Sequence, residues 1–371
     1  MITTQKTLGL IFAGMHDETL PQMTGVRSMG SVPFGGRYRL IDFPLSCMVN
    51  SGISKIGIIT KSRYQSLMDH IGSGKAWDLS RKQQGLYFLP PTDTADEKYA
   101  GRIASLDGIQ QFLRNSKEDY VVMSDCHVVG NIDYKALVKA HIETRADITV
   151  AYKKMPLPEN GAALTVDCDE SGRVTAVAIN PPDAGDCAVG LGLFVARKDV
   201  LMRLVAVAMS RNETSFERDI LQRQVNTLHI YGYEVTEYVR MITSPASYFK
   251  ANMELLDAGV RASLFLKKRP IFTKVHDSVP AVYGLDSHVT NSLVADGARI
   301  DGTVCNSIVF RGVHIEKGAT VENCIVMQGT TISKDSKLGF VVIDKDGLVK
   351  SGRTLAGHET YPMYITKGAI V

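Results

Sequence analysis

The sequence predicts a two-part α/β chain, in which a mostly parallel sheet with helices on its faces precedes a β-helix of hexapeptide repeats. Short apolar runs such as Leu8–Ala13 and Tyr120–Met123 alternate with helix-like stretches such as Tyr64–Ile71. This alternation is typical of a parallel sheet covered by helices. After about residue 287, aliphatic residues recur at spacings of four to six, with small residues or glycines between them. A length of 371 residues is ample for two domains at about 150 residues each.

The aliphatic residues of the C-terminal part predict coils that stack and bury a common ladder of side chains. The ladder consists of Val294, Ile300, Val304, Val309, Ile315, Val321, Val326 and Ile332. A β-sandwich of short strands is the alternative architecture. We place the first domain at 1–270, a connector at about 270–286 and the β-helix at 287–371. Before the connector, Ser247–Leu266 is predicted to form one helix capped by Ser247.

The bulk composition gives no reason to expect several classes of partner. The chain has 42 Lys and Arg against 39 Asp and Glu, a net charge of +3, which gives no reason to expect nucleic acid or a membrane surface as the partner. No apolar run approaches the roughly 18 residues of a membrane span, and the N-terminus lacks the features of a signal peptide. The six cysteines form no CxxC pair, which fits a reducing compartment. We therefore expect a cytoplasmic protein.

The segment Ser31–Ile53 carries the most specific motif of the chain. It reads SVPFGGRYRLIDFPLSCMVNSGI and resembles AVPFGGxYRxIDFxLSNxxNSGI, the hallmark of the glucose-1-phosphate adenylyltransferases, or ADP-glucose pyrophosphorylases. Residues 70–74 (HIGSG) and 247–256 (SYFKANMELL) agree with the same family, so the resemblance covers nearly the whole chain. It implies a Rossmann-like nucleotidyltransferase domain and a left-handed β-helix. It also implies a reaction of ATP with glucose 1-phosphate that yields ADP-glucose and pyrophosphate.

The phosphate loop departs from the family pattern AGGxGxRLxxLTxxRAKP. Gly14 and Arg27 match it. The departures are Met15 and Asp17 for two glycines, Thr19 for an arginine and Met29 for a lysine. They add bulk and negative charge, and remove cations, where backbone amides should approach phosphate. Because one lost oxyanion contact costs about 3–4 kcal/mol, we expect weak catalysis or none. The alternative is a rearranged but active loop in which Arg27, Arg37 or His16 substitutes.

Several family residues are also missing at the other positions that the resemblance assigns to the reaction. The metal-binding aspartate of the family corresponds to Asp125, which either binds Mg²⁺ or caps a turn, and the turn is favoured. The lysine for glucose 1-phosphate becomes Asn180, which carries no charge. The family's DFGxD becomes Ser215 through Asp219, and Asp219 is the second possible metal ligand. Of the family's GTADA only Gly101 remains. No cofactor is expected with certainty, and Mg²⁺ only if catalysis remains.

The residues that stay intact are those that build the fold, among them Gly35, Gly36 and Arg39. With Gly14, Arg27, Gly101 and Asp219, these three are the candidate substrate contacts. The pattern resembles the paralogous subunits of glycogen synthesis that pair with a catalytic ADP-glucose pyrophosphorylase and raise its activity.

We therefore expect a regulatory subunit, weak or inactive alone, in a hetero-oligomer that is a tetramer, with a degraded pocket that senses a phosphorylated metabolite. Two alternatives remain open. One is an active adenylyltransferase with an atypical loop. The other is a sugar-phosphate or nucleotide binding module without such a partner.

Overall fold

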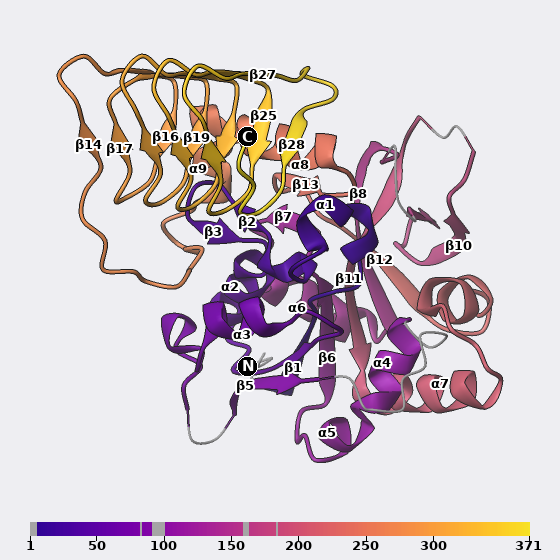
Figure 1. The fold of residues 1–371 in the computed structure, drawn as a ribbon. Helices are drawn as coiled ribbons and strands as arrows, with labels where there is room; N and C mark the ends of the chain where they lie inside the picture. The colour runs from indigo at the N-terminus through magenta and orange to yellow at the C-terminus, as the bar shows by residue number, and fades with distance from the viewer. Residues whose placement is uncertain (1–5, 82–83, 91–100, 159–162, 183–184) are drawn as a thin grey trace.

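A computed structural model describes residues 6–81, 84–90, 101–158, 163–182 and 185–371 (Figure 1). The first part of the chain is a nine-stranded sheet between helices, and the last part is a stack of coils that stands against one end of it. No helix in these ranges is long and apolar enough to cross a membrane.

The central sheet has the strand order β10-β9-β11-β6-β1-β4-β5, and β8 and β12 extend it from β11. Its strands are β1 (Thr7–Phe12), β4 (Lys55–Ile59), β5 (Gly85–Leu89), β6 (Tyr120–Asp125), β8 (Ile148–Pro156), β9 (Leu164–Cys168), β10 (Val174–Ile179), β11 (Asp186–Arg197) and β12 (Ile230–Glu234). β1 lies parallel to both β4 and β6, and β4 to β5, whereas β11 runs antiparallel to its neighbours. The predicted mostly parallel sheet is confirmed.

Apolar side chains on both faces of the sheet hold the helices in place. In β1, Leu8, Leu10 and Phe12 belong to the core on one face and Ile11 to the core on the other, the period-two alternation of a doubly covered strand. The helices are α1 (Pro21–Thr24), α2 (Asp42–Asn50), α3 (Gln65–Ile71), α4 (Arg102–Gly108), α5 (Gln110–Arg114), α6 (Tyr134–Thr144), α7 (Lys198–Ser210), α8 (Pro245–Met253) and α9 (Ala258–Leu264). Two short ribbons complete this part, β2 (Pro33–Phe34) with β3 (Tyr38–Arg39) and β7 (Val128–Gly130) with β13 (Val239–Met241).

The predicted single helix at Ser247–Leu266 is wrong. The structure has α8, a 3₁₀ turn at Glu254–Leu256 and then α9. Ser244, not Ser247, is the N-cap of α8, and the two serines form a reciprocal capping box. Asp257 caps α9 separately, accepting a hydrogen bond from the Val260 N–H, so the chain starts a new helix there instead of continuing the old one.

The C-terminal part is a left-handed β-helix, as expected. Three parallel five-stranded sheets form its sides. They contain β14 (Val282–Tyr283), β17 (Arg299–Ile300), β20 (His314–Ile315), β23 (Thr331–Ile332) and β26 (Leu348–Val349); β15 (His288–Thr290), β18 (Thr303–Cys305), β21 (Thr320–Glu322), β24 (Lys337–Gly339) and β27 (Thr354–Ala356); and β16 (Leu293–Val294), β19 (Ile308–Val309), β22 (Ile325–Val326), β25 (Val341–Ile343) and β28 (Met363–Ile365). The predicted ladder is in register, for example Val304 beside Val321 and Ile315 beside Ile332. β14 begins inside the segment predicted as the connector.

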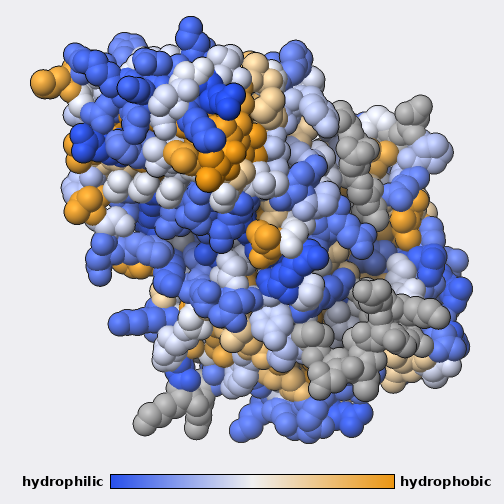
Figure 2. Space-filling view, viewed as in Figure 1, coloured by the Kyte–Doolittle hydropathy of each residue, from blue (hydrophilic) through white to orange (hydrophobic). Residues whose placement is uncertain are grey.

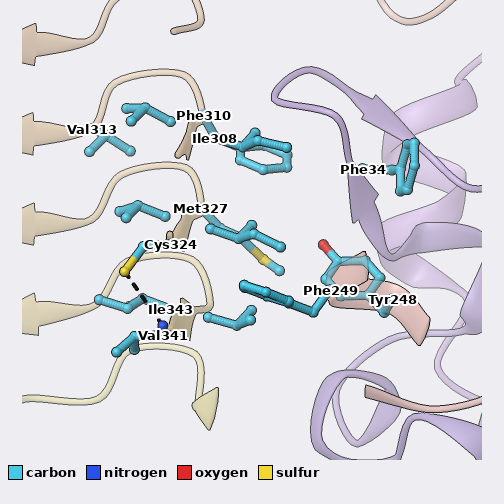
Figure 3. Close-up of a cluster of buried hydrophobic side chains, with 14 of the residues drawn as sticks. Phe34, Tyr248, Phe249, Ile308, Phe310, Val313, Cys324, Met327, Val341 and Ile343 are labelled. Carbon is cyan, nitrogen blue, oxygen red and sulfur yellow. Dashed lines mark hydrogen bonds between the residues drawn. The ribbon is translucent and has the colours of Figure 1, made fainter. Parts of the chain in front are cut away.

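A shared hydrophobic cluster joins the β-helix to the first part of the chain. Tyr248 and Phe249 of α8 point toward Phe310 and Met327 of the coils (Figure 3), and all four are buried. An ion pair also joins the two parts of the chain: Arg27 Nη1 lies 2.9 Å from Oδ1 of Asp344. Both side chains are almost fully buried, so the charge of each is stabilised by the other instead of by water.

We predict that Arg27→Met destabilises the protein by about 3–5 kcal/mol, because it leaves the Asp344 carboxylate buried without its cation. The free energy of unfolding from denaturant titration measures this loss. Arg299→Met is the matched control: Arg299 pairs with Asp301 at 3.0 Å, but 64% of its side chain is exposed, so its loss should cost less than about 1 kcal/mol. Equal losses in the two variants would contradict a special role for the buried pair.

Candidate functional site

A cavity of about 680 Å³ opens at the carboxyl ends of the parallel strands. Its walls come from the loop after β1, from α4, from the end of β6, from the middle of β11, and from the segments around Ser215 and Thr243. β1 and β6 pair so that Phe12 lies beside Asp125, which brings the loop after β1 and the end of β6 to the same edge. In sheets of this type, this edge is where ligands bind.

A buried ion pair between Asp125 and Arg102 lies at the floor of the cavity. Arg102 donates from Nη1 to Oδ1 at 3.0 Å and from Nη2 to Oδ2 at 2.8 Å, a two-pronged contact. The guanidinium carbon also lies 4.5 Å from the ring centre of Phe12 and 5.1 Å from that of Phe194. Asp125 is 1% exposed and Arg102 2%, so this charged pair is removed from solvent.

The ion pair keeps both partners ionised. Burial alone would raise the pKa of Asp125, but Arg102 and then His16 hold it well below its usual range. Burial would likewise lower the pKa of Arg102, whereas Asp125 and Glu217 raise it. Glu217 accepts from Arg102 Nε at 3.3 Å. The favoured interpretation of Asp125 as a turn cap is therefore corrected: its carboxylate is occupied by a guanidinium from α4.

Two histidines lie next to this carboxylate. His16 Nε2 is 3.0 Å from Asp125 Oδ2, and the ring of His16 lies 3.9 Å from that of His127, centre to centre. Burial and the nearby His16 lower the pKa of His127 well below its usual value, so this imidazole is neutral at neutral pH. Ligand atoms of His16, Asp125 and His127 all lie within 4.8 Å of one another.

In the loop after β1, the Asp17 carboxylate binds a backbone N–H group further along the chain. Asp17 Oδ1 accepts a hydrogen bond from the Met29 N–H at 2.7 Å. A side chain at Gly14 would meet the Asp17 carboxylate at 3.1 Å, so the carboxylate lies directly over the glycine. Burial raises the pKa of Asp17 to about 6, although the Met29 N–H and the nearby Lys61 act to lower it. Asp17 thus takes up a backbone donor of the kind that binds a phosphate oxygen in other loops.

Two other altered loop positions, Thr19 and Met29, lie in different environments. Thr19 lines the cavity, and its hydroxyl donates to the His16 carbonyl at 2.8 Å. Met29 is 1% exposed and packs in the core that joins the two parts of the chain. A basic side chain at position 29 would therefore enter an apolar environment.

Four candidate substrate contacts lie away from the main cavity. Arg27 is bound to Asp344 of the β-helix. Gly35 and Gly36 have φ of +58° and +84°, which the tight turn between β2 and β3 requires, and a Cβ at Gly35 would come within 2.8 Å of Leu255. Arg39 donates to the Ser66 hydroxyl at 2.9 Å and lines a second, smaller cleft.

Of the remaining sequence-predicted positions, one lines the cavity and the others are held elsewhere by contacts of their own. Ser215 lines the cavity and accepts from the Arg218 N–H at 3.1 Å. Asp219 is bound by Arg218 and by two backbone N–H groups, which hold its pKa at about 2. Asn180 accepts from the Ala163 N–H at 2.8 Å and so joins β9 and β10 at the open end of their hairpin. At Gly101 a Cβ would lie 2.3 Å from the Thr214 carbonyl oxygen, so this glycine allows a close backbone contact.

The sequence alone did not reveal Arg102, Glu217 or Gly192 as parts of the site. A signal for Arg102 was present, because a basic residue stands next to Gly101 where the resembled motif is uncharged. His16 was weighed only as a substitute in the loop. The pairing of Arg102 with Asp125 joins residues 23 positions apart and requires the fold.

The residues at the strand ends do not fit Mg²⁺. This ion is held in proteins by several oxygen ligands in octahedral geometry. Asp125 offers a single carboxylate, and its near neighbours are imidazoles instead of further oxygen ligands. Asp219, the other predicted ligand, is engaged by Arg218 and does not line the cavity.

Comparison with known proteins defines the class. Residues 8–258 match the nucleotidyl transferase family, and residues 278–360 match the GlmU-like C-terminal hexapeptide family. The chain therefore belongs to the nucleotidyl transferase family, with a hexapeptide β-helix attached.

Curated relatives place it more closely. The chain is 34% identical to the glycogen biosynthesis protein GlgD of Bacillus subtilis (strain 168), covering 98% of this chain and 96% of the relative. It is 37% identical to GlgD of Geobacillus stearothermophilus over 85% and 83% of the two chains. The glucose-1-phosphate adenylyltransferase of Thermotoga neapolitana is 32% identical over 85% of this chain and 76% of that enzyme. Within its class, the chain belongs with the GlgD proteins and the glucose-1-phosphate adenylyltransferases.

We predict that Asp17→Asn stabilises the protein at pH 7 and removes a pH dependence of its stability. The pKa of Asp17 rises from 3.8 to about 6 on folding, so its contribution is full below about pH 4 and is lost as the pH rises through about 6. The amide keeps an acceptor for the Met29 N–H without the buried charge. We expect a gain of about 1–3 kcal/mol at pH 7 and almost none at pH 4, measured by urea unfolding at both values. A gain of equal size at both would contradict the assignment to this carboxylate.

Proposed function

We propose that this chain is a subunit of ADP-glucose pyrophosphorylase in glycogen biosynthesis, weak or inactive alone, that associates with a catalytic partner subunit and activates it. The hetero-oligomer is expected to be a tetramer. The observation that carries the proposal is the state of the cavity: its aspartate is bound to Arg102 and its loop is bound to Asp17.

Both contacts oppose the chemistry of nucleotide transfer. Phosphoryl and nucleotidyl transfer depend on cations and backbone donors aimed at developing negative charge. Among the described residues that line the cavity, the one guanidinium or ammonium group belongs to Arg102, and it is committed to Asp125 and Glu217. Glu18 adds another carboxylate to the same wall. A triphosphate would meet acidic groups without free cations to balance them.

The surface of the C-terminal part supports association with other subunits. Exposed apolar side chains lie at both ends of the β-helix, most of them before and in its first coil and two of them in its last coils. They are Val275, Val279, Val282, Tyr283, Leu285, Tyr361 and Ile370. The face in Figure 2 is largely hydrophilic but carries an apolar area over the last coils. Such exposed apolar groups are typical of surfaces that bind other proteins.

A cytoplasmic location belongs to the same proposal. All six cysteines are free, the state expected in a reducing compartment.

The second cleft supports a phosphorylated metabolite as an effector. It lies between β3 and the coils and is lined by Arg37, Arg39, Arg311 and Lys345. Burial, and then the nearby Arg39 and Arg27, lower the pKa of Lys345 to about 7. Burial is the largest cause, but the guanidinium groups of Arg39 and Arg27 lower the pKa further, so several cations lie close together here and an anion would offset their charge.

The paired assay tests the main proposal. Pyrophosphate release from ATP and glucose 1-phosphate with Mg²⁺ is measured for this chain, for the catalytic homologue of the same organism, and for their mixture. We expect the chain alone to be slower than the homologue by about 10²-fold or more. We expect the mixture to exceed the homologue alone, whereas chain that was heat-denatured beforehand gives no increase.

Two other outcomes would replace the proposal. Turnover by this chain near that of the homologue would make it an adenylyltransferase with an atypical loop. No mixed oligomer in mass photometry and no change of rate on mixing would make it a binding module without such a partner.

We predict that sulfate, which does not titrate in this range, binds the second cleft more weakly as the pH rises from about 6.5 to about 8.5, because Lys345 loses its proton through about pH 7. The pKa values of His70 and His276 are lowered from 6.5, so both stay neutral over this interval. Lys345→Met should bind sulfate weakly at every pH, and the exposed Lys337→Met should behave as the wild type in calorimetry. Affinity that does not change with pH in the wild type would count against this cleft.

A further inference from the structure

Three potential metal donors converge at the floor of the cavity. They are His16 from the loop after β1, Asp125 from the end of β6, and His127 two residues further on. His16 is 26% exposed in its side chain, so it can turn, whereas Asp125 and His127 are buried. Two imidazoles and one carboxylate form a ligand set that suits a first-row transition metal rather than Mg²⁺.

An independent sign of a ligand is an unpartnered nitrogen. His127 is 3% exposed, and its Nδ1 has no hydrogen-bond partner among the described residues. A buried polar atom left without a partner costs about 1–3 kcal/mol.

A glycine next to the donors allows them to lie close to the backbone of β11. Gly192 in β11 has φ +62°, and a Cβ there would lie 2.5 Å from Asp125 Oδ2 and 3.1 Å from His127 Cε1. Any larger residue at this position would displace two of the three donors. The glycine itself lines the cavity, so the donors lie at the cavity wall.

We propose that His16, Asp125 and His127 bind one transition-metal ion, with Zn²⁺ as the occupant that these ligand types favour. The ion lies between His16 Nε2 and Asp125 Oδ2, in place of the hydrogen bond that joins them. The fourth ligand is a water that faces the cavity, as in open zinc sites.

Arg102 supports this ion from outside its ligand shell. Each carboxylate oxygen can accept more than one bond, so Asp125 can bind Arg102 and a metal together. The guanidinium fixes the orientation of the carboxylate, and Glu217 offsets the guanidinium charge. Carboxylates and imidazoles that bind metals are regularly held by such outer partners. The inference does not depend on the proposed function, because it concerns this chain alone.

The test is a titration of the full chain, freed of metal with a chelator, with Zn²⁺ in a calorimeter. We expect one equivalent to bind, and we expect His16→Gln and His127→Gln each to weaken binding by about 100-fold or more, because even the loss of an outer partner costs roughly 10–100-fold. His141→Gln is the matched control: His141 is also buried, and its Nε2 has no partner in the described structure, but it lies outside the site. It should bind Zn²⁺ as the wild type does.

A second pair of variants displaces a donor without replacing it, because a Cβ at Gly192 would collide with the Asp125 carboxylate. Gly192→Ala should abolish tight binding. Gly352→Ala carries similar backbone strain, with φ +72°, but its Cβ would meet nothing within 4 Å, so it should leave binding intact. Circular dichroism checks that each variant is folded. If His127→Gln unfolds, His16→Gln and Gly192→Ala still decide the question.

Several results would overturn the proposal. They are no uptake of Zn²⁺, unchanged affinity in the three site variants, or Mg²⁺ binding as tightly as Zn²⁺ at the same site. Co²⁺ offers a further readout through its absorption spectrum. Bands of nitrogen and oxygen coordination are expected, whereas a sulfur-to-cobalt charge-transfer band would place the ion on a cysteine instead.

Discussion

The ion pair between Arg102 and Asp125 determines how the cavity is built. It joins α4 to β6, orients the carboxylate at the end of the central strand, and places a guanidinium between the rings of Phe12 and Phe194. Removing two charges from water is costly, and the cost is recovered only when geometry and further hydrogen bonds are good. Here Glu217 and His16 supply those further contacts. The Arg102 and Asp125 charges at the cavity floor are therefore balanced by groups of the chain itself.

The same principle operates in the loop after β1. Asp17 brings a negative group to the Met29 N–H, and Arg102 brings a positive group to Asp125. In a nucleotide-transferring site, donors and carboxylates of these kinds serve the substrate and its metal. Here each has a partner from the protein, so the architecture of the enzyme is retained while its charges are used internally. This state is the basis of the proposal that the chain acts as a supporting subunit.

Much of the fold could be predicted because its signals are local. Apolar runs such as Leu8–Ala13 mark buried strands, and the ladder residues from Val294 to Ile332 repeat along the sequence itself. The broken helix after Ser244 was missed because apolar spacing continues across Asp257, where a local cap starts a new helix. The β-helix begins at Val282, earlier than its aliphatic spacing had suggested.

The candidate site was less predictable, because its contacts are formed by residues distant in sequence. Motif comparison identified Asp17, Thr19 and Asp125 as altered or displaced, but nothing in the sequence showed that Arg102 would bind Asp125. Arg27 was assigned to substrate because it matches a motif, yet its partner lies 317 positions away in the β-helix. Charge pairing across such separations is decided by packing, not by local pattern.

The in-register ladder of the β-helix also limits which insertions and deletions the chain can tolerate during evolution. Each coil places its aliphatic residues directly above those of the coil before it, as Val304, Val321 and Leu338 do. A single inserted or deleted residue within a strand would turn buried side chains outward in that coil and misalign it with both neighbours. A whole coil could be gained or lost without this penalty, because the new one would stack on the same ladder. During evolution the C-terminal part can therefore become longer or shorter by whole coils.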